Sequence, residues 1–167
     1  VRITHNILNK IYMSPDFRII TEMACSHHEK WDGTGYYRHL KGEEITLGGR
    51  ILAVADVFDA ITSKRHYRDK MPIANVLDIL IKGAGSHFDK NLVDTFLSIS
   101  TDKIVKVFLY ESNSKIAPKD AEVLKQYDLL SIYRMLSSET INEEQKTIID
   151  LFNKYYLGKF EEKGDVQ

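Results

Sequence analysis

The sequence predicts an all-α fold, and two observations carry this prediction. Apolar residues recur at intervals of three and four along most of the 167 residues, which is the spacing of one face of an α-helix. Proline and glycine are scarce, at 3 and 9 residues, so we expect no long disordered linker within the chain. One short run, KIVKVFLY at 103–110, is strand-like in composition and leaves helix and strand both open.

The first two predicted helices cover residues 3–11 and 16–30. Pro15 separates them, because proline ends a helical pattern. In the second helix, His27 continues an apolar face. Residues 31–47 then contain three glycines and no sustained period, so we expect a structured loop there.

The third predicted helix, residues 49–63, has an apolar face beside a second stripe. We expect the apolar face to be buried, and it consists of Ile51, Val54, Ala55, Phe58 and Ile61. The neighbouring stripe consists of Leu52, Asp56, Asp59 and Ser63. A carboxylate next to an apolar face is costly to bury unless it is paired or binds a metal, so Asp56 is a candidate functional residue.

The rest of the chain is also predicted to be mainly helical. Four more helices are expected over residues 72–81, 89–97, 118–136 and 142–160. Asp89 is a favourable N-cap, and Asn142 with Gln145 three residues later forms a capping-box signature. We expect residues 1–100 to form a helical domain and residues 101–167 a helical C-terminal extension.

Composition excludes several classes of protein. With 23 basic and 24 acidic residues the net charge is −1, so no basic field favours DNA or an anionic membrane. The one cysteine, Cys25, rules out an internal disulfide framework and a Cys-rich zinc module. No apolar run approaches the roughly 20 residues that span a bilayer. The chain opens on Val1 within a helical pattern, so we expect it to be part of a longer protein.

Two adjacent histidines, His27 and His28, precede Glu29 and the glycine-containing loop. Neighbouring residues on a helix point about 100° apart, so both can bind one metal ion at the helix end, or one can bind while the other faces away. For the pair taken alone, surface or satisfied core histidines are the favoured interpretation. Imidazoles together with the carboxylate of Asp56 suit zinc, iron or manganese. Asp59 could orient a ligand histidine or act within its own helix.

A basic turn with the sequence RHYR follows the third helix. Arg65 and Arg68 could bind a phosphate ester, because a guanidinium offers two hydrogen-bond donors to phosphate oxygens. Tyr67 lies between them. A solvated basic turn explains the same residues, since Lys64 and Lys70 lie nearby.

Together these motifs resemble the HD-GYP domain, an all-helical branch of the HD metal-dependent phosphohydrolases. The likeness rests on HHEKWDGTGYY at 27–37, RILAVADVFDAITSKRHYR at 50–68 and GSHFDKNLV at 85–93, in the family's order and spacing. It extends over about residues 3–96. The resemblance implies an HD-type helical bundle that hydrolyses cyclic di-GMP to the linear dinucleotide or GMP in bacterial second-messenger signalling.

The resemblance also implies roles for individual residues. The metal ligands would be His27, His28 and Asp56. The substrate-binding residues would be Arg65, Tyr67 and Arg68, with the tyrosine ring on a guanine. The GYP loop would be Gly35, Tyr36 and Tyr37. The family uses two or three divalent metal ions, most often iron or manganese, and no further catalytic residue is expected in this chain.

The sequence departs from the family's pattern at several points. Tyr37 replaces the proline of the GYP loop and His66 replaces the proline of the basic turn. We expect the loss of proline to free the loop and to impair its protein contacts. The family's His-Asp pair and a lysine are expected upstream of Val1, so the chain by itself should hold an incomplete ligand set.

Two functions of different classes remain open. The first is a cytoplasmic, metal-dependent cyclic-dinucleotide phosphodiesterase, whose partners would be cyclic di-GMP and a diguanylate cyclase domain bound through the GYP loop. The second is a degenerate, non-catalytic HD-GYP module that acts as a nucleotide receptor or interaction scaffold. Either could form a homodimer through the C-terminal helices.

Overall fold

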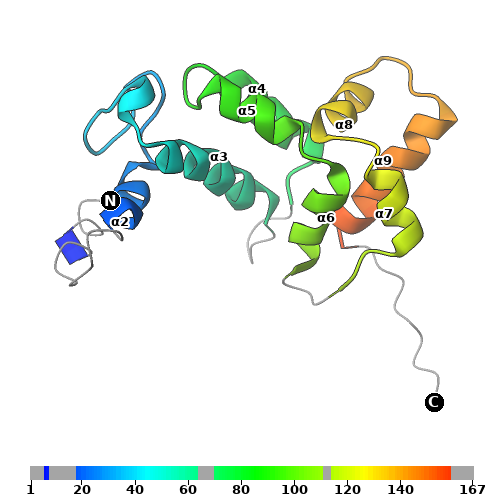
Figure 1. The fold of residues 1–167 in the computed structure, drawn as a ribbon. Helices are drawn as coiled ribbons and strands as arrows, with labels where there is room; N and C mark the ends of the chain where they lie inside the picture. Colours follow the sequence, from blue (N-terminus) through cyan, green and yellow to red (C-terminus); the bar gives the residue numbers. More distant parts are fainter. Residues whose placement is uncertain (1–5, 8–17, 64–69, 111–113, 159–167) are drawn as a thin grey trace. The chain divides into compact units, whose positions relative to one another are not determined.

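A computed structural model of the chain describes residues 6–7, 18–63, 70–110 and 114–158 (Figure 1). These residues form helices and contain no strand, so the predicted all-α class is confirmed. None of the described helices combines the length and apolar character needed to cross a membrane.

The chain divides into two compact units, which we call unit 1 (residues 1–95) and unit 2 (residues 96–167). The interpretation of the two parts as an HD-GYP region and a C-terminal extension stays a prediction.

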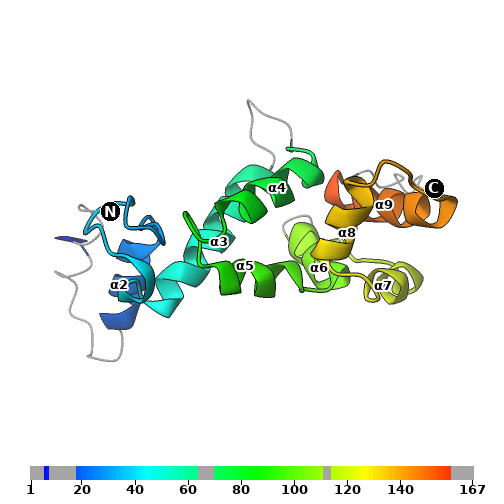
Figure 2. The ribbon, with the colours of Figure 1, turned by 90° about the horizontal axis from the view of Figure 1, so that it is seen from above.

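Unit 1 is built around its longest helix. Its elements are α2 (Arg18–Ser26), the 3₁₀ turn η2 (Gly42–Glu44), α3 (Leu47–Thr62), α4 (Ile73–Gly83) and most of α5 (Lys90–Leu97). α3 packs against α2 and against α4, which lies beside it in Figure 2. The predicted helix over residues 3–11 lies outside the described residues except for 6–7.

The contact between α2 and α3 depends on a glycine. A Cβ atom at Gly49 would lie 2.2 Å from Oγ of Ser26, which is closer than real Cβ contacts come. The Thr46 side chain accepts a hydrogen bond from the Gly49 N–H at 3.2 Å and so begins α3. The absence of a side chain at Gly49 therefore lets the start of α3 lie directly against the end of α2.

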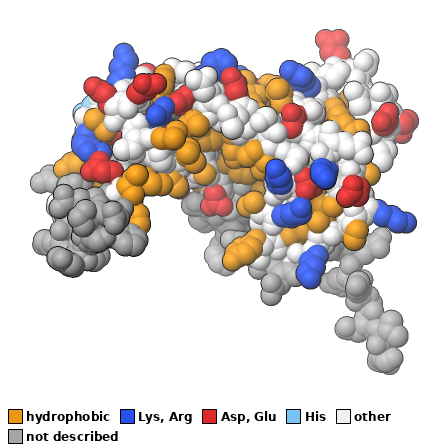
Figure 3. Space-filling view, viewed as in Figure 1, with side chains coloured by type: hydrophobic (Ala, Val, Ile, Leu, Met, Phe, Trp, Pro, Cys, Tyr) orange, Lys and Arg blue, Asp and Glu red, His pale blue; other side chains and the backbone are white. Residues whose placement is uncertain are grey.

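The predicted buried face of α3 is partly wrong. Val54 and Phe58 are buried as expected, but Ile51 is 48% exposed and Ala55 is exposed as well. Ala53 is buried instead, and both α2 and α4 pack against this helix. On the face shown in Figure 3, hydrophobic side chains accordingly gather on the surface over α3.

α2 ends earlier than predicted. The Ser26 hydroxyl donates to the carbonyl of Glu22 at 2.6 Å, and the Glu29 N–H donates to the Ser26 carbonyl at 3.0 Å. The second of these bonds closes a turn after the helix, so His27 and His28 follow α2 rather than form its last residues.

The predicted α4 and α5 are confirmed. Pro72 is the N-cap of α4, one position before the helix. The residues that α4 buries are Ile73, Val76, Leu77 and Leu80. Asp89 caps α5 as predicted, because its carboxylate accepts the Asn91 N–H at 2.9 Å.

Unit 2 consists of four helices in its described part. They are α6 (Thr101–Tyr110), α7 (Pro118–Leu124), α8 (Leu129–Leu136) and α9 (Glu143–Tyr156). α9 packs against the other three, and its face carries the buried Phe152 and Tyr156. The strand-like run at 103–110 is therefore helical, since it lies in α6 and faces α9.

One predicted helix of unit 2 is divided in the structure. Residues 118–136 form α7 and α8, because Asp128 accepts the Ser131 N–H at 2.7 Å and starts a new helix. The capping box of Asn142 and Gln145 at the start of α9 is confirmed.

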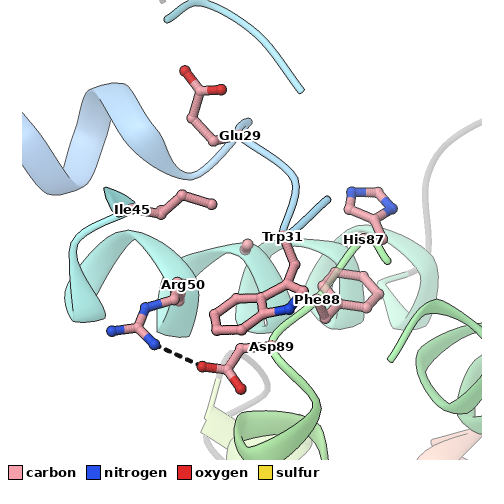
Figure 4. A pocket seen from close by; sticks show the side chains of 8 residues that line it. Glu29, Trp31, Ile45, Arg50, His87, Phe88 and Asp89 are labelled. Atoms are coloured by element: carbon pink, nitrogen blue, oxygen red, sulfur yellow. Dashed lines mark hydrogen bonds and ion pairs between the residues drawn. The ribbon is translucent and has the colours of Figure 1, made fainter. Parts of the chain in front are cut away.

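A buried ion pair joins α3 to the start of α5. Nη1 of Arg50 lies 2.7 Å from Oδ2 of Asp89, and the two side chains are only 16% and 6% exposed (Figure 4). The Trp31 ring covers the guanidinium, with its centroid 5.6 Å from Cζ of Arg50. Removal of one partner from such a pair leaves a buried charge without compensation.

We predict that Asp89→Asn lowers the free energy of unfolding by about 3 kcal/mol, because it keeps the cap but removes the charge that faces Arg50. Urea unfolding followed by the fluorescence of Trp31, the one tryptophan of the chain, measures this change.

The matched control is Asp94→Asn, which breaks an exposed pair with Lys90 at 2.6 Å. This control should change the free energy by less than about 1 kcal/mol. Equal effects of the two substitutions would contradict the role given to the buried pair.

Candidate functional site

The two histidines lie next to each other in the turn after α2. Their ring centroids are 4.0 Å apart and the ring planes are inclined by 41°. Nδ1 of His27 is buried without a hydrogen-bond partner among the residues that the structure describes. A buried polar atom of this kind needs an explanation, and a ring nitrogen that is available to a metal ion provides one.

The surroundings of His28 favour its neutral form. Burial lowers the pKa of the imidazole, the neighbouring His27 lowers it further, and the carboxylate of Asp56 opposes both. Neutral imidazole is the form that binds metal ions. The effect of Asp56 also shows that this residue of α3 lies within electrostatic reach of the histidine turn.

The three predicted metal ligands are not assembled as a site in this structure. Across residues 6–7, 18–63, 70–110 and 114–158, no three His, Cys, Asp or Glu side chains form a group that could hold a metal ion. The donor types of His27, His28 and Asp56 fit a first-row divalent ion, and so does the unpartnered nitrogen. The assignment of these residues as ligands stays a prediction.

The predicted substrate-binding residues Arg65, Tyr67 and Arg68 lie outside the described residues, so their roles stay predictions. Just before them, the Ser63 hydroxyl and N–H both donate to Asp59, at 3.2 Å to the carboxylate and 2.9 Å to the carbonyl. This geometry supports the second interpretation of Asp59, as a residue that acts within its own helix end.

The sequence interpretation missed the role of Glu29. Its side chain is only 1% exposed, and its carboxylate accepts three backbone N–H groups. The donors are Tyr37 at 2.8 Å, Arg38 at 2.6 Å and Leu40 at 3.2 Å. The only signal in the sequence was an acidic residue directly after the histidine pair, which a solvated helix end would also show.

The structure brings the GYP loop to the histidine turn. A Cβ atom at Gly35 would lie 2.2 Å from the backbone nitrogen of Lys30, so only glycine allows this approach. The Tyr36 N–H donates to the His28 carbonyl at 3.3 Å. The Tyr36 ring stacks on the His28 ring, with centroids 5.0 Å apart and planes inclined by 17°.

The expectation that loss of the family's proline frees the loop stays a prediction, and the structure shows a hydrogen bond of Tyr37 that proline could not make. The N–H that Tyr37 has in place of the proline ring donates to the buried carboxylate of Glu29. Proline has no N–H and could not make this bond. The replacement therefore exchanges a stiff ring for a charged hydrogen bond.

We predict that Tyr37→Pro lowers the free energy of unfolding by about 1 kcal/mol. The hydrogen bond to Glu29 is worth about 1.5–3 kcal/mol, whereas proline gains about 0.4–1 kcal/mol by restricting the unfolded chain. Urea unfolding should show this difference relative to Tyr37→Ala, which removes the ring but keeps the donor. A proline variant as stable as the alanine variant would contradict the prediction.

Comparison with known proteins identifies the family of the chain. The family model for the HD domain matches residues 2–92. A cyclic di-GMP phosphodiesterase of Vibrio cholerae is 45% identical over 89 residues, which are 53% of this chain and 18% of that protein. A cyclic di-GMP phosphodiesterase of Thermotoga maritima is 38% identical over 89 residues, which are 53% of this chain and 24% of that protein.

A third relative is the 3'3'-cGAMP-specific phosphodiesterase 3 of Vibrio cholerae, which is 49% identical over 77 residues, or 46% of this chain and 16% of that protein. The chain thus spans between 16% and 24% of the length of these three relatives. The predicted likeness to HD-GYP proteins is confirmed. Because the family model covers more than half of its residues, the chain belongs to the HD domain family.

Proposed function

We propose that this protein is a metal-dependent phosphodiesterase that hydrolyses cyclic di-GMP to the linear dinucleotide or GMP. The observation that carries the proposal is the buried, unpartnered Nδ1 of His27 beside a His28 whose surroundings favour the neutral imidazole. Both lie within residues 2–92, which the family model for the HD domain matches, and relatives named cyclic di-GMP phosphodiesterases match 53% of this chain. The reaction would belong to bacterial second-messenger signalling in the cytoplasm.

The metal-binding part of the proposal assigns His27, His28 and Asp56 as the ligands from this chain. Two imidazole nitrogens and one carboxylate suit iron or manganese, and two or three such ions are proposed. Bound metal ions supply positive charge to a scissile phosphate and lower the pKa of water. The turn after α2 and the start of the GYP loop hold the two imidazoles, and Asp56 adds a negative charge from α3.

The substrate-binding part assigns Arg65 and Arg68 to the phosphates and Tyr67 to a guanine. These residues follow α3, the helix that carries Asp56, which supports a location near the metal ligands. The exposed rings of Tyr36 and Tyr37, at 55% and 40%, offer apolar surface to a diguanylate cyclase domain. A homodimer through the helices of unit 2 belongs to the same proposal.

The second candidate is a non-catalytic HD-GYP module that binds nucleotide or protein, and an incomplete ligand set in the described residues is compatible with it as well as with the enzyme. The described residues contain no assembled group of three potential ligands. Binding of cyclic di-GMP without turnover by the metal-loaded, full-length protein would support this candidate and exclude the enzyme.

We predict that His28→Ala and Asp56→Ala in the full-length protein lower its iron or manganese content and reduce turnover of cyclic di-GMP at least about 100-fold. Elemental mass spectrometry and chromatography of the products measure the two effects, with 3'3'-cGAMP as a second substrate. His39→Ala, at an exposed loop position, is the control. Undiminished turnover after chelation would refute metal dependence.

We further predict that Arg65→Ala and Arg68→Ala each lower kcat/KM by about ten- to over a hundredfold, with unchanged metal content. A hydrogen bond to a charged phosphate is worth about 1.5–3 kcal/mol, which corresponds to this range. Arg68→Lys should lower kcat/KM less than Arg68→Ala does, because lysine keeps the positive charge. It should still lower kcat/KM, because an ammonium group cannot form the two-pronged contact of a guanidinium. Lys64→Ala removes a charge from the same turn and is the control. Wild-type kcat/KM in both alanine variants would favour the solvated turn.

A further inference from the structure

We propose that Glu29 is a positioning residue, which fixes the orientation of the His28 imidazole through the GYP loop. The part of this inference that concerns metal binding rests on the proposed function. The part that concerns the orientation of the His28 ring rests on the described contacts alone.

Glu29 is held in a way that orders several residues at once. Oε1 accepts the N–H groups of Tyr37 and Arg38, and Oε2 accepts the N–H of Leu40. The guanidinium of Arg38 forms an ion pair with Glu22 at 2.7 Å. Arg38 therefore binds Glu29 through its backbone N–H and Glu22 through its charged side chain. Backbone donors thus compensate this buried carboxylate, and the loop must keep one conformation to supply them.

Tyr36 lies between two fixed points of this loop. Its own N–H donates to the His28 carbonyl, and the next N–H along the chain donates to Glu29. The close approach of Gly35 to Lys30 restricts the backbone on the other side. With the backbone held at both neighbours, the Tyr36 ring lies flat against His28.

The stacked ring restricts His28. An imidazole can turn about its side-chain bonds, and a ligand that must point at a metal ion gains affinity when neighbouring groups hold its orientation. The Tyr36 ring covers one face of the imidazole at a centroid distance of 5.0 Å. Loss of the carboxylate at residue 29 should release the loop, and with it this contact.

The first test observes His28 without any metal ion. In the chelator-treated, full-length protein with labelled histidine, at constant pH, the ring current of Tyr36 shifts the imidazole proton resonances of His28. Tyr36→Leu gives the resonance positions without this ring. Glu29→Gln keeps the size of the side chain, but its NH₂ cannot accept, so at least one of the three N–H groups loses its acceptor.

We expect Glu29→Gln to move the His28 resonances toward those of Tyr36→Leu. The control Glu43→Gln, at an exposed position of η2, should leave them in place. If circular dichroism shows that Glu29→Gln does not fold, Tyr37→Pro, which removes one donor of the three, carries the same expectation. Wild-type resonances in a folded Glu29→Gln protein would overturn the proposal.

The second test measures Mn²⁺ affinity by titration calorimetry. Glu29→Gln and Tyr36→Leu should each weaken binding about 10- to 100-fold. The double variant should bind Mn²⁺ no more weakly than the weaker-binding single variant, because both residues act through one contact. If the affinity losses of the two single variants multiply in the double variant, Glu29 and Tyr36 do not act through one contact, which would contradict the proposal. If the wild-type protein binds no Mn²⁺ while the resonance shift is observed, the proposed function fails and the positioning role stands.

Discussion

The candidate site depends on the burial of one carboxylate. A charged group can leave water only when other groups replace its hydrogen bonds, and for Glu29 three backbone N–H groups do so. They come from positions 8 to 11 residues later in the chain, so the loop has to fold back over the histidine turn. The stacking of Tyr36 on His28 and the close approach of Gly35 follow from this arrangement.

A second buried carboxylate, that of Asp89, is compensated by different means. Asp89 uses the guanidinium of Arg50 and the first turn of α5, and Trp31 from the loop covers the guanidinium. Figure 4 shows both acidic residues around one small cavity, Glu29 at the loop and Asp89 beside Arg50. Glu29 binds the backbone of the loop, whereas Asp89 joins α3 to the start of α5.

The proposed chemistry uses residues with unequal support from the structure. The turn that holds His27 and His28 is ordered by local bonds and by the GYP loop, and it provides a buried nitrogen without a described partner. Asp56 acts on His28 from the exposed face of α3, without forming an assembled ligand group in the described residues. The best-defined part of the proposed metal site is therefore the histidine pair.

The sequence by itself determined the all-α class, most helices and the caps at Asp89 and Asn142, because these depend on interactions between residues two to four positions apart. It also identified the histidine pair through its motif. Only the tertiary structure decided the buried face of α3 and the role of Glu29. Contacts such as Gly49 with Ser26, or Glu29 with Leu40, join residues whose separation follows no local period. Hydrophobic periodicity therefore predicts which segments are helical, whereas long-range packing and hydrogen bonding select the faces and carboxylates that are buried.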